Sequence, residues 1–444
     1  MSTKDAVAKT DPTDSRRLRL RQPTRDQVTP VPAYLDDVLP EDHLARLIWQ
    51  ATGLLDLSPF SAHLVVTEEG PGRAAASPQL LVALWLYATS QGVTSARELA
   101  RLCVRDLAYI WLCGGVTMNY HTLSDFRVLY QEALEQLMTE VLGRLLHAGL
   151  VKLEHVAQDG LRVRATAGAA SFRRQPSLEK CLAQARQFLT SLLEEDAPER
   201  ADDDEPPSGR QQAARERAAR ERVARLEAAL AEMPAVRETK RTDEERAQAR
   251  VSSTDPEARV MKMGDGGFRP AYNFQFAVDT AERVIVGVAV NNVGSDMEQM
   301  PPMAQQVEQH CAALPDDWLM DGNFASKKAI EFGTAKGMRV LAPVQKPKKE
   351  DRDPHVPLPG DSPAVAAWRK RMGTPEAKET YKLRAATVEL VNAQVRCRHG
   401  LQQLRVRGRL KALCVALWVA ITHNLLIWLR HLVSTGTLQV ATVG

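Results

Sequence analysis

A short alternating stretch before the middle of the chain combines apolar positions with one acidic residue. Over residues 157–163 (AQDGLRV), every second residue falls on the same face of a strand, and Asp159 shares that face with Ala157, Leu161 and Val163. A carboxylate on an apolar face is costly unless it is neutralised. The pattern is compatible with an ion-paired strand residue. It also predicts a metal ligand at the centre of a sheet, provided that other carboxylates reach Asp159.

The region before this strand has the periodicity of several helices joined by tight turns. The Ser-Pro pair at 77–78 predicts a helix start, Ser95 and Glu98 form a capping box, and a long helix is expected from 121 to 147. We therefore expect an all-α DNA-binding region of helix-turn-helix type over 31–150, although a plain helical bundle fits the pattern almost as well. The arginines expected to be exposed on it are Arg97, Arg101, Arg105 and Arg127.

Strand patterns return after residue 270 and then alternate with helices. Strands are expected at 272–278, 284–290, 318–321 and 339–344, and helices at 302–311, 327–336 and 376–396. Three early strands followed by alternating units predict an α/β domain with a mixed sheet and helices on its faces. Asp321 falls at the carboxyl end of its strand, where ligand sites tend to form.

Two further helices lie between the first strand and the second. Apolar positions from 178 to 192, and a seam from Ala219 to Met233 spaced four-three-four-three, predict an antiparallel helical hairpin. The expected division of the chain is a flexible polar arm at 1–30, the helical region at 31–150, the α/β domain at 151–432 with the hairpin inserted at about 175–250, and a tail at 433–444.

Charge distribution and cysteine content limit the binding partners and the cellular compartment that can be expected for the protein. The 58 Lys and Arg nearly balance the 55 Asp and Glu, but residues 338–411 hold 17 basic against 7 acidic residues. That local excess suits a polyanion, and a solvated surface would also carry it. The six cysteines form no CxxC pair and no Cys/His cluster, which predicts free thiols, no zinc site and a cytoplasmic location.

One segment has the composition of a membrane span. Residues 410–429 are strongly apolar, but Lys411, His423 and Asn424 interrupt them and basic residues flank both ends. This pattern favours a buried helix over a membrane helix. The N-terminal 27 residues are polar and lack the apolar core of a signal peptide. We therefore expect no membrane association.

Three separated carboxylates, Asp159, Asp321 and Glu389, are the candidate catalytic and metal-binding residues. Such a set suits a hard cation such as Mg²⁺ or Mn²⁺, and two ions of this kind support phosphodiester chemistry. Alone, Glu389 would more often be a surface residue, but helical spacing puts it on one face with Lys382 and Arg396. The candidate DNA-binding residues, placed to position backbone phosphates, are Lys382, Arg384 and Arg396.

These residues resemble the motifs of the DDE transposases of bacterial insertion sequences, in the IS-four/IS-five-type group. The first-aspartate motif is similar to residues 159–165 (DGLRVRA), and the second to residues 321–325 (DGNFA). The third resembles a tyrosine–arginine–glutamate–lysine signature, here Tyr381, Arg384, Glu389 and Arg396. This chain departs from the signature in two ways: four residues instead of three separate the arginine from the glutamate, and arginine replaces the final lysine.

The resemblance implies an RNase H-like catalytic domain and a DNA substrate. It implies an enzyme that binds terminal inverted repeats, hydrolyses a phosphodiester to free a 3′-hydroxyl, and directs that hydroxyl onto target DNA. It further implies that the carboxylates hold two Mg²⁺ ions, with Mn²⁺ as an alternative, and that a homodimer pairs the ends. A metal-dependent RNase H-like nuclease that does not join strands, and a non-catalytic DNA-binding protein derived from a transposase, remain as alternatives.

Overall fold

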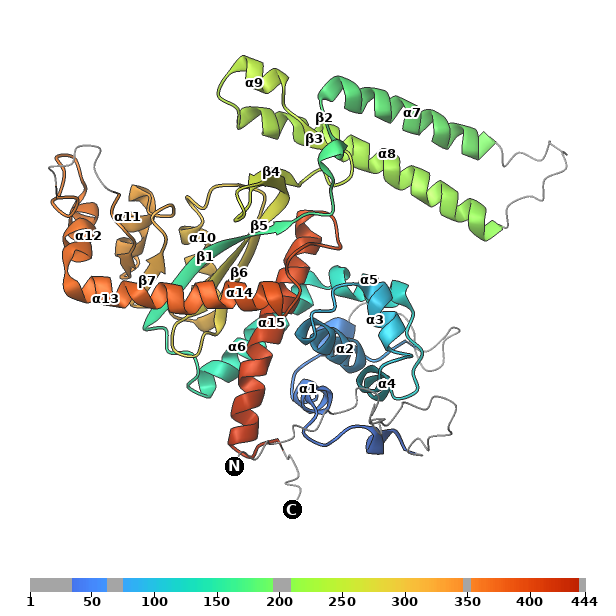
Figure 1. The fold of residues 1–444 in the computed structure, drawn as a ribbon, viewed down its shortest axis with the longest axis horizontal. Helices are drawn as coiled ribbons and strands as arrows, with labels where there is room; N and C mark the ends of the chain where they lie inside the picture. The colour runs from blue at the N-terminus through green and yellow to red at the C-terminus, as the bar shows by residue number, and fades with distance from the viewer. Residues whose placement is uncertain (1–33, 62–74, 195–208, 346–352, 439–444) are drawn as a thin grey trace, which may run out of the picture.

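The computed structural model describes residues 34–61, 75–194, 209–345 and 353–438. The polar arm expected at 1–30 and the last residues of the expected tail lie outside the described residues. Figure 1 shows an α/β core, a block of N-terminal helices beside it and a two-helix arm that leaves the core near β2 and β3 and extends above the N-terminal block.

The core is a six-stranded mixed sheet. Its strands run in the order β4-β5-β1-β7-β8, and β6 also pairs with β5. β5 pairs antiparallel with β1, β4 and β6, whereas β1-β7 and β7-β8 are parallel pairs. This is the RNase H-like mixed sheet that was expected. The strands are β1 (His155–Arg164), β4 (Arg259–Lys262), β5 (Phe268–Asp279), β6 (Ile285–Asn291), β7 (Asp317–Met320) and β8 (Arg339–Leu341).

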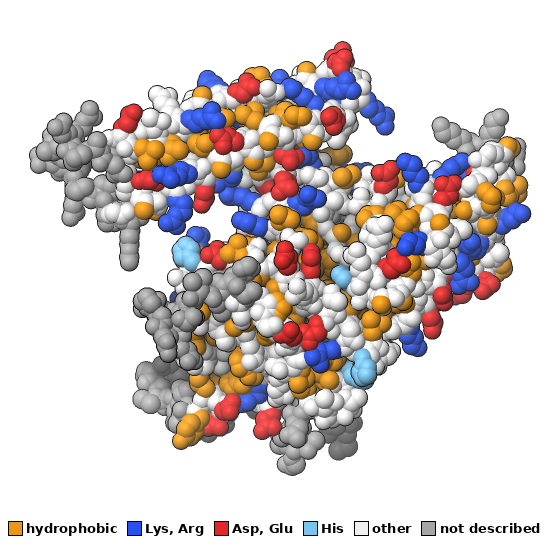
Figure 2. Space-filling model, turned by 180° about the vertical axis from the view of Figure 1, so that it is seen from behind, with side chains coloured by type: hydrophobic (Ala, Val, Ile, Leu, Met, Phe, Trp, Pro, Cys, Tyr) orange, Lys and Arg blue, Asp and Glu red, His pale blue; other side chains and the backbone are white. Residues whose placement is uncertain are grey.

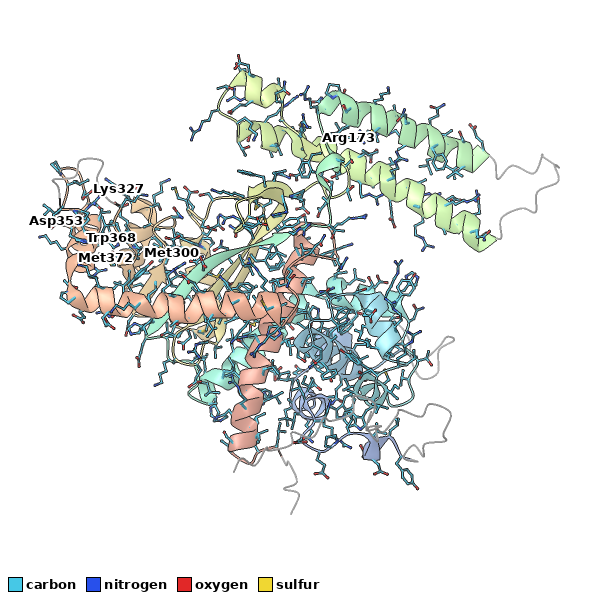
Figure 3. All side chains as sticks on the ribbon, in the orientation of Figure 1. Arg173, Met300, Lys327, Asp353, Trp368 and Met372 are labelled. Atoms are coloured by element: carbon cyan, nitrogen blue, oxygen red, sulfur yellow. The ribbon has the colours of Figure 1, made fainter. Side chains whose placement is uncertain are left out.

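Helices cover the sheet and close the core. α10 (Met300–Cys311) packs against β6, and α11 (Lys327–Ala335) packs against β8. A helix that the sequence pattern did not predict, α12 (Pro363–Gly373), also contacts α11 and β8. Figure 3 shows Trp368 and Met372 of α12 beside α11, and both side chains are buried. The sequence does carry a start signal for α12, Ser362 followed by Pro363 at the first turn.

Buried polar residues lie on the face of β1 opposite Asp159. Asn273 Nδ2 and Gln275 Nε2 donate to Asp296 Oδ1 over 2.6 and 2.7 Å. A Cβ atom at Gly160 would lie only 2.7 Å from Gln275 Nε2 and 2.9 Å from Asn273 Oδ1. Only glycine leaves room for these three side chains behind the strand. Gln158, on the same face, accepts a hydrogen bond from Trp318 Nε1 of β7 over 3.1 Å, which ties β1 to its parallel neighbour.

The apolar C-terminal segment is the helix α15 (Arg409–Ser434), which runs through the protein. By length and composition it would suffice to cross a membrane, but 89% of its most apolar window is buried inside the protein. The polar residues that interrupt it have partners there. Asn424 accepts from the backbone nitrogen of Ile285 over 2.9 Å and donates to its carbonyl over 2.8 Å, and His423 Nε2 lies 2.9 Å from the carbonyl of Arg283. The expectation of a buried helix is confirmed.

The N-terminal block is helical, as predicted, with more breaks than expected. Ser77 caps its helix through a 3.2 Å bond to the Leu80 nitrogen. The helix expected over 121–147 is two helices that meet at Tyr130, where ψ is 48°. The elements are η1 (Leu35–Val38), α1 (Leu44–Thr52), η2 (Ser58–Ser61), α2 (Pro78–Ser90), α3 (Ala96–Leu102), α4 (Leu107–Cys113), α5 (Tyr120–Leu129) and α6 (Gln131–His147).

Two glycine turns join this block to the α/β core. Gly92, after α2, and Gly400, after α14 (Leu390–Cys397), both have positive φ, at 72° and 71°. A Cβ at Gly92 would lie 3.0 Å from the carbonyl oxygen of Arg398, and one at Gly400 would lie 2.8 Å from the Gly92 carbonyl oxygen. The two backbones therefore touch directly, and a hydrogen-bond contact of 3.3 Å between His399 Nδ1 and the Thr89 carbonyl supports them.

The projecting arm is the predicted helical hairpin. α7 (Gln175–Glu194) packs on α8 (Gly209–Glu238), and a short α9 (Asp243–Ala247) follows. The hairpin has a hydrophobic cluster of its own, which the sequence seam anticipated through Leu226 and Met233. The cluster consists of Leu178, Leu182, Ala185, Leu226, Ala229, Met233, Val236, Ala249 and Val251.

The ends of the hairpin return to the same place. β2 (Phe172–Arg173) pairs antiparallel with β3 (Val251–Ser252), and the Ser171 and Ser252 hydroxyl oxygens lie 2.8 Å apart. Figure 3 marks Arg173 at this base, where the arm leaves the core. A chain entering and leaving through one small antiparallel pair can carry an insertion at little cost to the domain.

We predict that replacing residues 177–250 with a short Gly/Ser linker leaves a folded protein. The buried apolar residues at the centre of the hairpin form a cluster of their own, separate from the main core, so removal of the hairpin takes few contacts from that core. Circular dichroism should show one cooperative thermal transition, lowered by no more than about 5 °C, as expected for a loss of about 1 kcal/mol in a large domain.

The matched control is Leu226→Ala in the full chain, which creates a cavity in the hairpin cluster. It should loosen the hairpin, measured as faster proteolysis of α8, while the main transition stays in place. A deletion variant without any cooperative transition would show that the hairpin is part of the main core.

Candidate functional site

The strand pairing brings two of the three candidate carboxylates together. β1 and β7 are parallel neighbours whose register ends with Gln158 opposite Met320. The next residue on each chain is the candidate aspartate, Asp159 within β1 and Asp321 directly after β7. Neighbouring strands lie about 4.8 Å apart, so this register holds the two aspartates at adjacent positions on neighbouring interior strands, where β7 ends beside the middle of β1.

The third carboxylate, Glu389, lies on a helix that crosses the sheet. The helix expected over 376–396 consists of α13 (Pro375–Arg384), a π turn (Ala385–Glu389) and α14, in direct succession. The π turn contacts both β1 and β5. Figure 1 shows the combined helix running across the sheet from α12 to the middle of α15, where His399, just after α14, lies 6.1 Å from His423 between ring centroids.

The π turn accounts for the unusual spacing between Arg384 and Glu389. These residues are five positions apart, whereas the family signature has them four apart. An α-helix aligns residues four apart, and a π turn, with its i to i+5 hydrogen bonds, aligns residues five apart. The wider turn therefore absorbs the additional residue, and Arg384 and Glu389 face one another. Arg384 Nη1 donates to Glu389 Oε1 over 2.9 Å.

Arg384 is shared between two of the carboxylates. Its Nη2 also forms an ion pair of 3.0 Å with Asp159 Oδ1. The Arg384 and Asp159 side chains are only 11% and 22% exposed, whereas that of Glu389 is 55% exposed. Burial acts to lower the pKa of Arg384, but the attraction of Asp159, Tyr381, Asp321 and Glu389 outweighs it and raises this pKa. Burial raises the pKa of Asp159, against the attraction of Arg384.

Asp321 and Tyr381 complete the neighbourhood. Asn323 Nδ2 donates to Asp321 Oδ2 over 3.2 Å. Burial raises the pKa of the Tyr381 hydroxyl, and the charges of Asp321, Glu389 and Asp159 add to that increase while Arg384 opposes it. The charge of Asp321 also contributes to the raised pKa of Arg384. The three acidic groups therefore act on the same arginine and tyrosine.

The other two candidate DNA-binding residues are on the surface. Lys382 was expected on the same helix face as Glu389, but the π turn shifts the helix phase between them. Lys382 Nζ instead pairs with Glu379 over 2.6 Å, and both side chains are largely exposed. Arg396, in α14, is exposed as well. Arg384 is the one of the three that reaches the carboxylates.

One residue of the site was not singled out from the sequence. Asn392, on α14, is buried and donates from Nδ2 to Asp159 Oδ2 over 3.0 Å. Arg384 and Asn392 thus hold the two oxygens of Asp159 separately. The signal was the position of Asn392, three residues after Glu389 on the same helical face, where an amide beside small residues is well placed to meet the sheet.

The donor set suits a hard divalent cation. Carboxylate oxygens are the ligands that Mg²⁺ and Mn²⁺ prefer. The guanidinium of Arg384 is the positive charge that Asp159 and Glu389 share in this structure. With Arg384 at this position, no three His, Cys, Asp or Glu side chains within the described ranges are grouped closely enough to hold a metal ion.

Comparison with protein families gives two matches along the chain. A family described as "Transposase domain (DUF772)" matches residues 33–129, and a family described as "Transposase DDE domain" matches residues 241–425. The second match includes Asp321 and Glu389, whereas Asp159 lies before its start. Searches of curated proteins and of solved structures found no match.

The two matches agree with the two parts of the structure. The first lies on the N-terminal helices, and the second begins after α8 and ends within α15. Transposases of the DDE type act on DNA and generally use a divalent metal ion. Two transposase domains in sequence, together with an RNase H-like sheet, show that this chain belongs to the DDE transposase family.

Proposed function

We propose that this transposase cuts DNA at the ends of its own element and joins the freed 3′-hydroxyl to target DNA. The observation that supports this proposal is the meeting of Asp159 and Glu389 at one cation, Arg384, with Asp321 in register beside Asp159. A phosphodiester reaction needs this combination, because positive charge must face the phosphate where negative charge develops.

Asp159, Asp321 and Glu389 would hold two Mg²⁺ ions, with Mn²⁺ as an alternative. When bound, such ions activate the attacking oxygen and stabilise the leaving oxygen of the phosphodiester. Asn392 keeps Asp159 in a fixed orientation through its bond to Oδ2. Arg384 neutralises Asp159 and Glu389 in the absence of metal, and it can contact a phosphate only after it leaves these two partners.

The remaining DNA contacts belong to exposed residues around the site. Lys382 and Arg396 would hold backbone phosphates on either side of Glu389. The N-terminal helices would help to recognise the terminal inverted repeats, and a homodimer in the cytoplasm would pair the two ends. Figure 2 shows the hairpin projecting over a hollow bordered in part by Lys and Arg side chains, which suits a DNA segment held between the arm and the N-terminal block.

Our first prediction for this function is that Asp159→Asn, Asp321→Asn and Glu389→Gln each abolish cleavage of a DNA end. Loss of a metal ligand removes several kcal/mol of charge stabilisation, so the rate should fall by at least about a hundredfold. Affinity for the same DNA should stay within about threefold, because the phosphate contacts remain.

Glu308→Gln is the matched control for this series, because Glu308 is a partly exposed carboxylate whose partner is Lys336. It should cleave at the wild-type rate. Wild-type-like cleavage by any of the three site variants would remove that residue from the site. Cleavage without any joined product would favour a nuclease over a transposase.

The second prediction concerns the exchange of Arg384 for metal. Arg384→Ala leaves the carboxylate of Asp159 without its counter-charge, and removal of one partner of a half-buried pair should cost about 1–3 kcal/mol of unfolding free energy in EDTA. In Mg²⁺ the loss should be smaller, because the ion takes over the neutralisation. Urea denaturation with and without Mg²⁺ measures both values.

Lys382→Ala is the control for Arg384→Ala, since its exposed pair with Glu379 contributes little to stability. It should change the unfolding free energy by less than about 0.5 kcal/mol in either condition. An equal loss for Arg384→Ala with and without Mg²⁺ would contradict the exchange.

The third prediction is that Lys382→Ala and Arg396→Ala weaken DNA binding to the same degree for end sequences and scrambled sequences. A phosphate contact carries no base information, and its loss should make the slope of log affinity against log salt shallower by about one. Fluorescence anisotropy over a range of salt measures the slope. Selective loss for one sequence at constant slope would show a base contact instead.

A further inference from the structure

Arg127, in α5, is a buried guanidinium outside the site. The sequence predicted an exposed arginine here, and that prediction is wrong: its exposed fraction is 7%. The guanidinium lies over the ring of Trp85, 4.8 Å from the centroid, and Nη1 donates to the carbonyl of Thr94. The sequence prediction failed because α5 turns this residue toward Trp85 of α2, a tertiary contact that helical periodicity does not encode.

The positive charge of Arg127 has no acidic partner in the part of the chain that the structure describes. Among the described residues, no carboxylate forms an ion pair with it, and its buried Nε has no hydrogen-bond partner. Burial lowers the pKa of Arg127 to about 10, so the group still carries its charge at neutral pH. A buried charge without a counter-charge is costly, and proteins normally pair such a group or use it to bind an ion.

Arg127 lines a cavity of about 750 Å³. The cavity lies where the N-terminal helices meet the loop between α14 and α15, residues 398–408. Arg97, Arg101 and Arg405 line it as well. Among the described residues that line the cavity, Glu98 is the one carboxylate, and it is paired with Arg101 over 2.6 Å. Three arginines are therefore left to act on whatever enters the cavity.

The cavity lies close to the strand that carries Asp159. Arg405 follows Leu404, whose nitrogen donates to the carbonyl of Arg164 at the end of β1 over 2.8 Å. Arg164 is five residues from Asp159, about 17 Å along a strand at about 3.3 Å per residue.

We propose that this cavity binds a backbone phosphate of the DNA whose cleavage site lies at Asp159. The inference rests on the proposed function and adds to it a second anchoring point, beyond the far end of the strand that carries Asp159. A phosphodiester oxygen at Arg127 supplies the missing counter-charge, while Arg97 and Arg405 reach the same phosphate or its neighbour from the rim. The side-chain hydroxyls of Ser95 and Ser124, also in the lining, supply further donors.

The first test measures the affinity of the full chain for a labelled duplex taken from the DNA that borders the gene. Arg97→Ala and Arg405→Ala should each bind about five- to tenfold more weakly at about 0.1 M salt, with a salt slope shallower by about one. Arg430→Ala, an exposed arginine of α15 outside the cavity, is the matched control and should keep the wild-type slope.

The second test separates the cavity from the surrounding surface, because Arg127 lines the cavity and its side chain is only 7% exposed. Arg127→Lys keeps the charge and should keep the slope, whereas Arg127→Met should lose about one unit of it. Thermal denaturation checks that each variant folds. If Arg127→Met does not fold, the result for Arg97→Ala and Arg405→Ala decides the question.

A third test uses inorganic pyrophosphate as a probe, to distinguish a cavity that binds a DNA phosphate from one that binds a free anion. A rise in Tm with pyrophosphate that depends on Arg127, combined with wild-type DNA affinity and slope in all cavity variants, would show a free-anion site and overturn the proposal. Unchanged slopes without any pyrophosphate effect would overturn it too. In both cases a loss of cleavage by Asp159→Asn leaves the proposed function intact, whereas a wild-type protein that binds no DNA would contradict that function itself.

Discussion

The arrangement of the α/β core around the candidate site depends on the ion pairs that one arginine, Arg384, forms with two carboxylates. Asp159 lies within the sheet and loses much of its hydration, so a positive charge must stand beside it. Arg384 provides that charge, and it does so from a helix that has to cross the sheet at close range. The π turn, the amide of Asn392 and the buried polar layer behind Gly160 all serve to hold strand and helix in this relation.

Much of this arrangement was predictable from the sequence, because its chemistry depends on residues in strongly periodic segments. The strand of Asp159, the strand that leads to Asp321 and the helix of Glu389 each have a clear pattern, and their order along the chain implies one mixed sheet. The apolar α15 was predictable for a similar reason, since its Asn424 needs a partner that a membrane interior does not offer.

What the sequence did not reveal depends on contacts between distant segments. A π turn differs from an α-helix by one hydrogen-bond register, and its trace in the sequence is the one additional residue between Arg384 and Glu389, which does not by itself specify a π turn. The break at Tyr130 is similar, because the apolar pattern continues through it. The burial of Arg127 was unpredictable since an arginine on an amphipathic helix is usually solvated, and only the position of Trp85 on another helix makes it otherwise.

The contact between the Gly92 and Gly400 turns has a consequence for how the enzyme would locate its cutting position. The two backbones touch without an intervening side chain. The helix that carries Glu389 and the N-terminal helices are therefore held at a fixed position relative to one another. DNA bound by the N-terminal helices would thus lie at a fixed distance from the candidate carboxylates. The number of base pairs between the recognised sequence and the cut would therefore be fixed by the fold.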